Sequence, residues 1–200
     1  MAPAPFVVQP LEGGNLLYDI YARMLEERMV FVTGGVDDEM ADRVVAQLLY
    51  LEATDSKKEA LVVVNSPGGS ITAGMAIFDT MRGVSYDVST ICIGQAASMG
   101  AIIMLAGTNG KRLALPNARL LIHQPLGGSY GTSIDIEIQT AEIIRLKEVL
   151  SRLISEETGQ PYEKVVKDTD RDNFMTAQEA KKYGLIDKIV KEFPGRTSKK

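Results

Sequence analysis

The feature that most constrains this fold is an uncharged, β-branched run that leads into small residues and then into an apolar helix. Residues 88–93, Val-Ser-Thr-Ile-Cys-Ile, are typical of a buried strand. The run from Met99 to Ala106 contains no charged residue and predicts a buried helix. A buried strand followed directly by a buried helix indicates a sheet covered by helices, which is the arrangement of α/β proteins.

The rest of the chain repeats this strand–helix order. Further strands are expected at residues 29–33, 60–64, 113–115, 119–122 and 185–190. Further helices are expected at residues 19–28, 38–51, 70–81, 133–157, 162–168 and 176–183. The sequence shows no internal repeat and no linker, so it predicts one α/β domain with a mainly buried sheet.

Composition limits the partners and the location. The 200 residues are 45% hydrophobic and 24% charged, as in soluble globular domains, and the net charge of −4 argues against nucleic acid as the main partner. No window is long and apolar enough for a membrane span, and the N-terminus lacks a secretory signal, so we expect no membrane association and a cytoplasmic location. The chain has a single cysteine, Cys92, so no disulfide can form within it. With only one further soft ligand, His123, the chain cannot assemble a transition-metal cluster, and no metal site is predicted.

Three segments differ from the central domain. Residues 1–17 mix Pro, Gly and isolated hydrophobic residues, which predicts a flexible N-terminal arm, and the basic residues 194–200 predict a disordered tail. Residues 18–193 then form the single domain. Within it, residues 133–157 contain no Pro or Gly and carry more apolar side chains than one side of a helix on a small domain can use. We therefore expect this helix to project and to contact another subunit.

Ser98 stands between the central strand and its helix, within Gly94-Gln-Ala-Ala-Ser-Met-Gly-Ala101. A turn there would raise the hydroxyl out of the sheet, and the N-terminus of the following helix would offer free N–H groups and positive partial charge. A nucleophilic serine needs both features. A serine that only caps a buried helix fits the same stretch equally well, because such junctions commonly carry a serine cap.

Three other segments supply groups that serine catalysis would need, although each also has a purely structural explanation. His123 is the one imidazole available as a general base, but a lone histidine is more often a hydrogen-bonded structural residue. The loop 168–174 holds aspartates that could orient the imidazole, but it also fits a solvated connector. The two glycines of Asn65-Ser-Pro-Gly-Gly69 could direct N–H groups at an oxyanion, or could simply form a turn.

Four motifs in this order resemble the ClpP family, the proteolytic subunits of the Clp protease. They are Asn65-Ser-Pro-Gly-Gly-Ser-Ile-Thr-Ala-Gly74, Gly94–Ala101, His123-Gln-Pro-Leu-Gly-Gly128 and Thr169-Asp-Arg-Asp-Asn-Phe174. The similarity extends over nearly the whole chain, from about Tyr18 to Val190. Four motifs in register make the resemblance specific, whereas each motif alone is a weak signal.

The resemblance implies a serine endopeptidase with assigned site residues. Ser98 matches the nucleophile, His123 the base and Asp172 the carboxylate that orients the base. The backbone N–H groups of Gly69 and Met99 match the oxyanion-hole donors. The substrate would lie extended, as a strand, beside a second group of residues, which comprises Ser70, Ile71, Pro125, Leu126 and Gly127.

The family's fold and assembly follow as expectations from the same resemblance. The ClpP/crotonase fold has a head domain of stacked β-β-α units, and the segment from about 127 to 157 corresponds to the handle that joins two rings. Members form two stacked heptameric rings around a chamber, into which a hexameric AAA+ unfoldase passes unfolded polypeptides. The chain has no Gly-x-x-x-x-Gly-Lys phosphate loop, so we expect no cofactor here and ATP use by the partner. We also expect Arg171, between two aspartates, to pair across the ring–ring contact and so to link ring docking to catalysis.

Some positions depart from the family's usual pattern. Gly13-Gly-Asn-Leu-Leu17 stands where a Gly-Glu-Arg motif is common, and positions that usually carry aromatic residues in the unfoldase-docking cleft hold Leu61, Val63 and Gly83. These departures fit a ring mixed with a second ClpP-like subunit as well as a homomeric one. Two other functions stay open: a crotonase-like acyl-CoA enzyme, which would not need the three catalytic side chains together, and a non-catalytic ring subunit, which would be expected to lack one of them.

Overall fold

The structure, a computed structural model, describes residues 5–11, 14–128 and 130–194. The strands are β1 (Phe6–Leu11), β2 (Gly14–Asp19), β3 (Met29–Val36), β4 (Ala60–Gly69), β5 (Val88–Ala97), β6 (Arg112–Ala114), β7 (Arg119–Ile122), β8 (Asn173–Thr176) and β9 (Lys188–Ile189). The helices are α1 (Ile20–Glu26), α2 (Asp38–Thr54), α3 (Ile71–Gly83), α4 (Met99–Leu105), α5 (Ser133–Thr158), α6 (Tyr162–Asp168) and α7 (Ala177–Tyr183). Strands and helices alternate along most of the chain, so the α/β prediction is confirmed.

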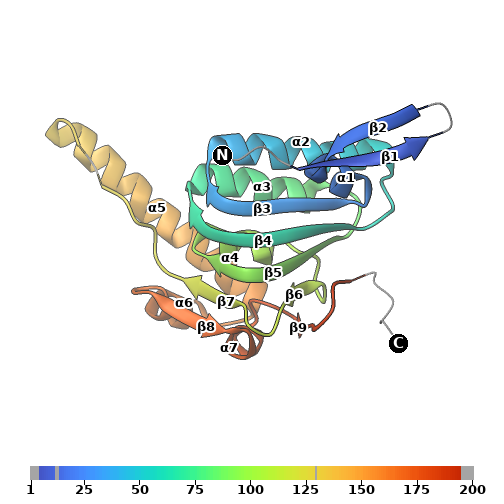
Figure 1. Cartoon of the computed structure of the whole chain (residues 1–200). Helices are drawn as coiled ribbons and strands as arrows, with labels where there is room; N and C mark the ends of the chain where they lie inside the picture. The colour runs from blue at the N-terminus through green and yellow to red at the C-terminus, as the bar shows by residue number, and fades with distance from the viewer. Residues whose placement is uncertain (1–4, 12–13, 129, 195–200) are drawn as a thin grey trace.

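The main sheet has seven strands in the order β3-β4-β5-β6-β9, with β7 paired to β5 and β8 paired to β7 (Figure 1). All of these pairs are parallel except β7–β8. β5 pairs with β6 through its first half and with β7 through its second half. The sheet therefore divides along β5, and the second half of β5 leads to Ser98 beside β7.

The long strands continue past the points where the sequence predicts their ends. Expected ends at residues 33, 64 and 93 are replaced by ends at Val36, Gly69 and Ala97. The pairing register shifts between Thr33 and Gly35 in β3–β4, and again in β4–β5 just after Val64. Such irregularities bend a strand without ending it, so glycines that predict turns lie inside strands here.

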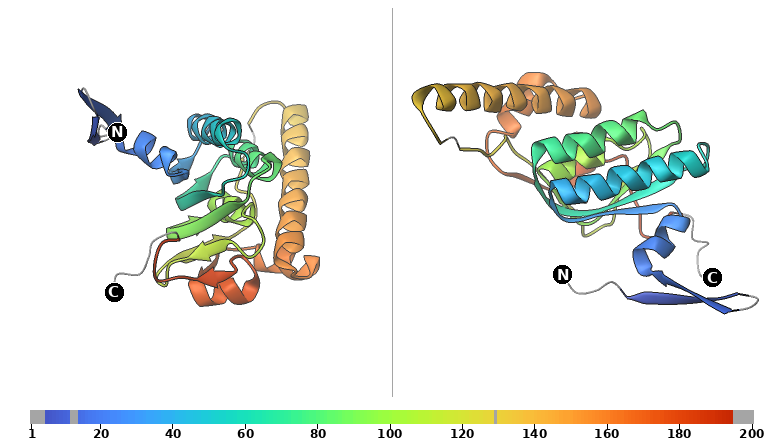
Figure 2. Two further views of the ribbon diagram at one scale, coloured as in Figure 1. Left: turned by 90° about the vertical axis from the view of Figure 1, so that its right-hand side faces the viewer. Right: turned by 90° about the horizontal axis from the view of Figure 1, so that it is seen from above.

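Helices α2, α3 and α5 lie on one face of the sheet (Figure 2), and α4 contacts β4, β5, α3 and α5. Every residue of α4 is buried, which confirms the prediction of a buried helix after Ser98. Helix α2 begins at Asp37, whose side chain accepts a hydrogen bond from the Met40 N–H at 2.8 Å. Its buried residues recur at helical spacing and comprise Met40, Ala41, Val44, Leu48 and Leu51. The buried side chains of these helices and of the sheet form one apolar core, which includes Ala96 near the end of β5.

The opposite face of the sheet is covered less completely. Helix α1 lies against β3, and the rings of Tyr21 and Phe31 meet edge to face with their centres 5.5 Å apart. A second apolar cluster on the strands is centred on Val63, Ile91 and Leu113. The positions that differ from the family pattern, Leu61 and Val63, belong to this cluster, and the side chain of Val63 is buried.

Three parts of the chain differ from the predictions. The expected flexible arm contains a regular antiparallel hairpin of β1 and β2, although its residues 1–4 and 12–13 lie outside the described part. The last strand was expected at residues 185–190, but β9 contains only residues 188–189. The apolar residues Leu185 and Ile186 are buried in the turn before β9 and not in the strand. The acidic segment, expected to be a loop up to residue 174, runs into β8 from Asn173. Of the expected basic tail, residues 195–200 also lie outside the described part.

Helix α5 extends well beyond the sheet (Figure 1). Its 26 residues span about 39 Å at about 1.5 Å per residue. It begins with a capping box between Thr132 and Asp135 and ends at Gly159 in the left-handed conformation. Only its second half packs on the head, and large apolar side chains stay exposed along it, namely Ile134, Ile136, Ile138, Ile144 and Val149. Large apolar side chains exposed along a helix in this way are a feature of helices at subunit contacts.

Candidate active site

Ser98 lies at the junction of β5 and α4 in a backbone conformation that a non-glycine residue seldom adopts. Its φ is 54° and its ψ is −122°, and its N–H donates to the Leu121 carbonyl at 2.9 Å. Backbone outliers of this kind cost about 1–3 kcal/mol and persist where the surrounding structure holds them. The hydroxyl makes no capping hydrogen bond to α4. The alternative of a simple helix cap therefore has no support, and the turn presents the hydroxyl outward, as a nucleophile requires.

Free backbone N–H groups lie beside this hydroxyl. Met99 begins α4, and its N–H has no backbone partner within the described chain. On the neighbouring strand, Ser70 donates its N–H to the Val36 carbonyl at 2.7 Å. Because successive N–H groups along a strand point to opposite sides, the Gly69 N–H faces away from β3, and Gly69 lines the cleft at Ser98. Gly69 and Met99, the two residues predicted to supply oxyanion donors, therefore line the same cleft as Ser98.

Gly68, predicted only as a turn residue or N–H donor, has a steric role at the site. A Cβ atom at this position would lie 2.6 Å from the Cβ of Ser98 and 2.7 Å from the Ala97 carbonyl oxygen. Its φ of +92° is also in the region that favours glycine. Its N–H donates to the Ser66 hydroxyl at 3.1 Å. Gly68 therefore allows β4 to pass directly against the serine, a role that its place beside Gly69 in the motif does suggest.

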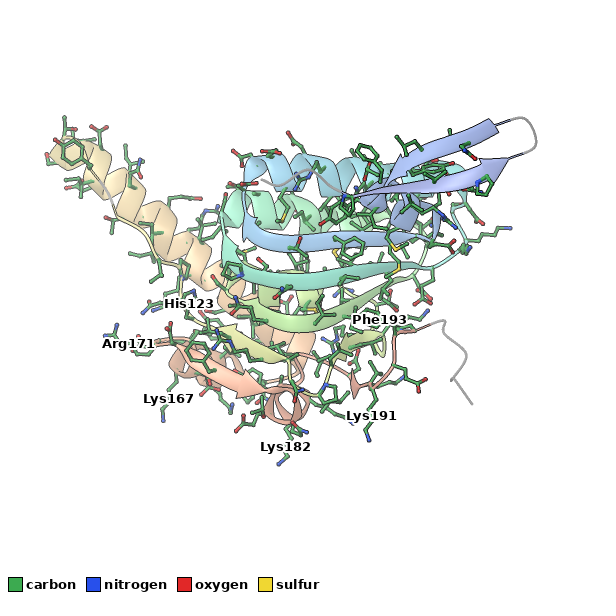
Figure 3. All side chains as sticks on the ribbon, in the orientation of Figure 1. His123, Lys167, Arg171, Lys182, Lys191 and Phe193 are labelled. Carbon is green, nitrogen blue, oxygen red and sulfur yellow. The ribbon has the colours of Figure 1, made fainter. Side chains whose placement is uncertain are left out.

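His123 and Asp172 come from segments far apart in the sequence and are joined by a hydrogen bond. His123 Nδ1 lies 2.9 Å from Asp172 Oδ1. The imidazole is 15% exposed and the carboxylate 62% exposed. An ionised carboxylate only accepts hydrogen bonds, so Nδ1 carries the proton and Nε2 of the neutral ring is free to accept one. This is the arrangement that orients a histidine as a general base. Figure 3 shows His123 at the end of β7.

Ser98 and His123 line one cleft with a volume of about 360 Å³. Apolar side chains form most of its wall, namely Ile71, Met99, Ile102, Ile122, Leu150 and Ile154. No hydrogen bond joins the hydroxyl of Ser98 to the imidazole within the described chain. Catalytic hydrogen bonds are often long before a substrate is bound, so the absence of this one does not argue against a serine–histidine pair. What relates the two residues is that both line the same cleft.

The residues expected to hold a substrate strand lie mostly on this cleft. Ile71, Pro125 and Leu126 line it, whereas Gly127 does not, and the Leu126 side chain is 80% exposed. Ser70 is placed differently, because its hydroxyl caps α3 by accepting from the Ala73 N–H at 3.3 Å. β4 and the segment after His123 thus form two sides of the cleft, with Ser98 between them.

Two residues close in sequence to the proposed triad do not line the cleft, namely Cys92 and Arg171. Burial raises the pKa of the Cys92 thiol to about 11, so this side chain is a core residue and a poor nucleophile. Arg171, the residue before Asp172, has a side chain that is 91% exposed and points away from the head (Figure 3). Its Nε is 3.9 Å from Asp170 Oδ2. Within the described residues, no three His, Cys, Asp or Glu side chains gather as metal ligands.

A comparison with protein families agrees with this site. The family model described as Clp protease matches residues 12–193. The chain belongs to the Clp protease family. It is accordingly a peptidase, a hydrolase of the Clp type, and its α/β fold is that of the ClpP family. The alternative of a crotonase-like acyl-CoA enzyme has no support, because the matching family model is that of the Clp protease, as the four motifs predict.

The family assignment covers almost the entire described chain, including all the residues brought together in the cleft. No helix in the described part of this Clp protease is long and apolar enough to cross a membrane. The polar residues Gln124 and Lys147, which adjoin the site without lining it, were not predicted from the sequence. Gln124 could have been considered from its place next to His123, whereas no local pattern marks Lys147.

Proposed function

We propose that this chain is the serine endopeptidase subunit of a self-compartmentalised Clp-type protease. It would hydrolyse unfolded proteins delivered by an ATP-dependent AAA+ unfoldase, and short peptides without that partner. The observation that carries the proposal is the position of Ser98, strained and uncapped, in one cleft with His123, whose other ring nitrogen is bonded to Asp172. In this proposal ATP is used by the partner and not by this chain.

Bond cleavage begins with attack of the Ser98 hydroxyl on the substrate carbonyl. His123 Nε2 takes the hydroxyl proton, and Asp172 stabilises the imidazolium through Nδ1. The carbonyl oxygen becomes an oxyanion held by the N–H groups of Met99 and Gly69. Loss of one such donor lowers kcat about 10²- to 10³-fold in serine peptidases.

The tetrahedral intermediate then collapses. The C–N bond breaks, the imidazolium returns its proton to the leaving amine, and the acyl group stays on Ser98 as an ester. Water attacks the ester with His123 again as the base, which releases the acid product and restores the serine hydroxyl. Every proton in this cycle passes through His123, so a single histidine is sufficient.

Substrate recognition rests mainly on the backbone. An extended peptide would lie between β4 at Gly69–Ile71 and the segment Pro125–Gly127 and would pair with their main-chain groups. Main-chain pairing is tolerant of sequence, which suits a protease that degrades unfolded chains. The apolar wall of the cleft favours a large apolar side chain next to the scissile bond.

The proposed assembly is two stacked heptameric rings, either homomeric or mixed with a second ClpP-like subunit. The projecting α5 with its exposed apolar side chains supports a contact between the rings. Among the described residues, the exposed guanidinium of Arg171 has one ion-pair partner, Asp170, with Nε and Oδ2 3.9 Å apart, and it is available to pair across that contact. In this arrangement ring docking positions the backbone next to Asp172 and thereby favours catalysis.

A fluorophosphonate probe tests the catalytic assignment. The probe is expected to label the intact protein covalently and to leave Ser98→Ala unlabelled, and only the intact protein is expected to cleave a small fluorogenic peptide. Labelling of Ser98→Ala at the wild-type rate would remove Ser98 from the mechanism. A wild-type protein that neither reacts with the probe nor cleaves the peptide, although assembled, would favour the non-catalytic ring subunit.

A further inference from the structure

The side chain of Gln124 joins the segment that bears the proposed base to two other parts of the chain. Its neighbours His123 and Pro125 both line the cleft, but Gln124 does not. Successive side chains of an extended segment point to opposite sides, so the Gln124 amide is directed away from the substrate. On that side it meets the segment 169–172 and helix α5.

Four hydrogen bonds fix this residue, the longest of which runs from Gln124 Nε2 to Asp170 Oδ1 at 3.4 Å. Lys147 Nζ donates to Gln124 Oε1 at 2.8 Å, and Gln124 Nε2 donates to the Asp170 carbonyl oxygen at 2.8 Å. The backbone N–H of Gln124 donates to the Thr169 carbonyl at 2.6 Å. An ammonium only donates and a carbonyl only accepts, so the two ends of the amide cannot be exchanged. The orientation of Gln124 is therefore dictated by its partners.

Lys147 differs from the other cations of α5. Arg145 and Arg152 form ion pairs with glutamates one turn away on the same helix. Lys147 instead directs a partly buried ammonium at the neutral amide of Gln124 and has no ion pair within the described chain. A hydrogen bond from a charged donor is stronger than one between neutral groups, and partial burial strengthens it further.

These contacts hold the segment that carries Asp172 at both ends. Gln124 binds the carbonyl groups of Thr169 and Asp170 on one side, and Asn173 pairs with Ile122 on the other. Between them, the carboxylate of Asp172 is 62% exposed and is hydrogen-bonded only to His123 within the described chain. The position of the Asp172 carboxylate therefore depends on the backbone of residue 172. That backbone is held on one side by the contacts of Gln124 and on the other by the pairing of Asn173 with Ile122.

We propose that Gln124 is a positioning residue for the His123–Asp172 pair and that Lys147 locks it in place. The inference rests on the proposed triad and adds a physical link from α5 to that triad. Neither side chain touches the substrate, so both act on the chemical step through the distance between Nδ1 and the carboxylate. Removing either one lowers kcat and leaves KM nearly unchanged.

Two variants that nearly conserve volume separate the parts of the link. Gln124→Glu keeps an acceptor for Lys147 but loses the donor to Asp170 and places two carboxylates together. Lys147→Met keeps the stem of the side chain and loses the donor. Each is expected to lower kcat for a small peptide about 10- to 100-fold, the range found when outer hydrogen-bond partners of functional groups are removed. Lys147→Arg, which retains a donor, is expected to recover most of the loss.

Arg145→Met is the matched control, because it removes a cation two residues away whose partner is an exposed glutamate. It is expected to keep wild-type kcat. Sedimentation velocity on the same samples establishes that all the variants are assembled alike, and Lys147→Met decides the outcome if Gln124→Glu fails to assemble. The rate of fluorophosphonate labelling is expected to fall with kcat.

Unchanged kcat in assembled Lys147→Met would overturn the inference, as would a rise in KM at constant kcat or an Arg variant no better than the Met variant. Ser98→Ala and His123→Ala are measured beside these proteins. If both are inactive while the Gln124 and Lys147 variants are fully active, the triad stands and only this inference fails. If both retain activity, the proposed function itself fails.

Discussion

His123 and Asp172 are opposite each other because they extend the antiparallel ladder between β7 and β8. The last pair of that ladder is Ile122 with Asn173, and one further step along each strand brings His123 opposite Asp172. The hydrogen bond of 2.9 Å between their side chains is thus a cross-strand contact of a sheet. The register of two short strands, and not a loop conformation alone, sets the geometry of the proposed base.

Asp172→Asn is expected to lower kcat about 10³- to 10⁴-fold, by the precedent of serine peptidase triads. The amide fills the same space but carries no charge to stabilise the imidazolium. Kinetics with a small peptide measure the loss, and thermal melting should stay near wild type because the carboxylate is 62% exposed. A loss below tenfold in an assembled protein would contradict the role given to Asp172.

Ser98→Gly and Ser98→Ala are both expected to be inactive but to differ in stability. The Ser98 φ of 54° is strained for alanine and relaxed for glycine. Ser98→Gly should therefore be more stable than Ser98→Ala by about 1 kcal/mol, net of the greater freedom of glycine in the unfolded chain. Denaturant melts at equal protein concentration check the order. A less stable glycine variant would show that the turn is not strained in solution.

Gly68→Ala is expected to destabilise the protein and to abolish cleavage. The added Cβ would lie 2.6 Å from the Cβ of Ser98, and φ is +92°. Gly35→Ala is the control, since its Cβ would meet nothing within 4 Å and its φ is ordinary. Peptidase rates and melting temperatures of the two variants decide the matter. Equal behaviour of the two would mean that β4 does not press on the serine.

Arg112 and Asp187 give the structure a specific sensitivity to acid. Burial by itself would raise the pKa of the Asp187 carboxyl, but hydrogen bonds from the Arg112 side chain and backbone more than offset this and hold the pKa below its ordinary value of 3.8. The distances are 2.7 Å from Arg112 Nη2 to Oδ1 and 2.8 Å from the Arg112 N–H to Oδ2. Because the unfolded chain takes up the proton at higher pH, the pair stabilises the fold above the ordinary pKa and loses this effect as pH falls through the lower folded pKa.

Asp187→Asn is accordingly expected to destabilise the protein at neutral pH by about 3 kcal/mol, since it leaves the buried Arg112 without its counter-ion. The gap between wild type and variant should narrow below about pH 4, where the wild-type carboxyl also becomes protonated. Melting temperatures from pH 7 to pH 3 measure this trend. Glu142→Gln, in an exposed pair on α5, should melt like wild type throughout. A constant gap across this range would rule out the linkage.

Arg171→Ala is expected to convert double rings into single rings and to lower peptidase activity in parallel. Its side chain is 91% exposed in the single chain, so the loss of the guanidinium removes no internal contact beyond the Asp170 contact at 3.9 Å. Sedimentation velocity and a peptide assay on the same samples report both effects. Fully active single heptamers, or unchanged double rings with unchanged activity, would break the proposed coupling.

Local patterns were sufficient to predict much of this protein. The uncharged run before Ser98 and the apolar run after it predicted a buried strand and helix, because a residue's burial is encoded in its own hydrophobicity. The spacing of Thr176 and Glu179 predicted the start of α7, where the structure has a capping box, and α6 also occurs at the residues where it was expected. Four short motifs also led to the Clp protease family, which the family comparison shows for residues 12–193.

Long-range pairing was not predictable in the same way. The acidic segment gave no sign of β8, since a short exposed strand is defined by its partner β7 and not by its own residues. Gly34 and Gly35 looked like a turn but lie within β3, because a register shift absorbs them. Lys147 and Gln124 are 23 positions apart, and only the packing of α5 against the head brings the ammonium to the amide. The residues of the proposed site could be recognised from local sequence motifs. The distances between them could not, because those distances depend on which strands pair and on how the helices pack.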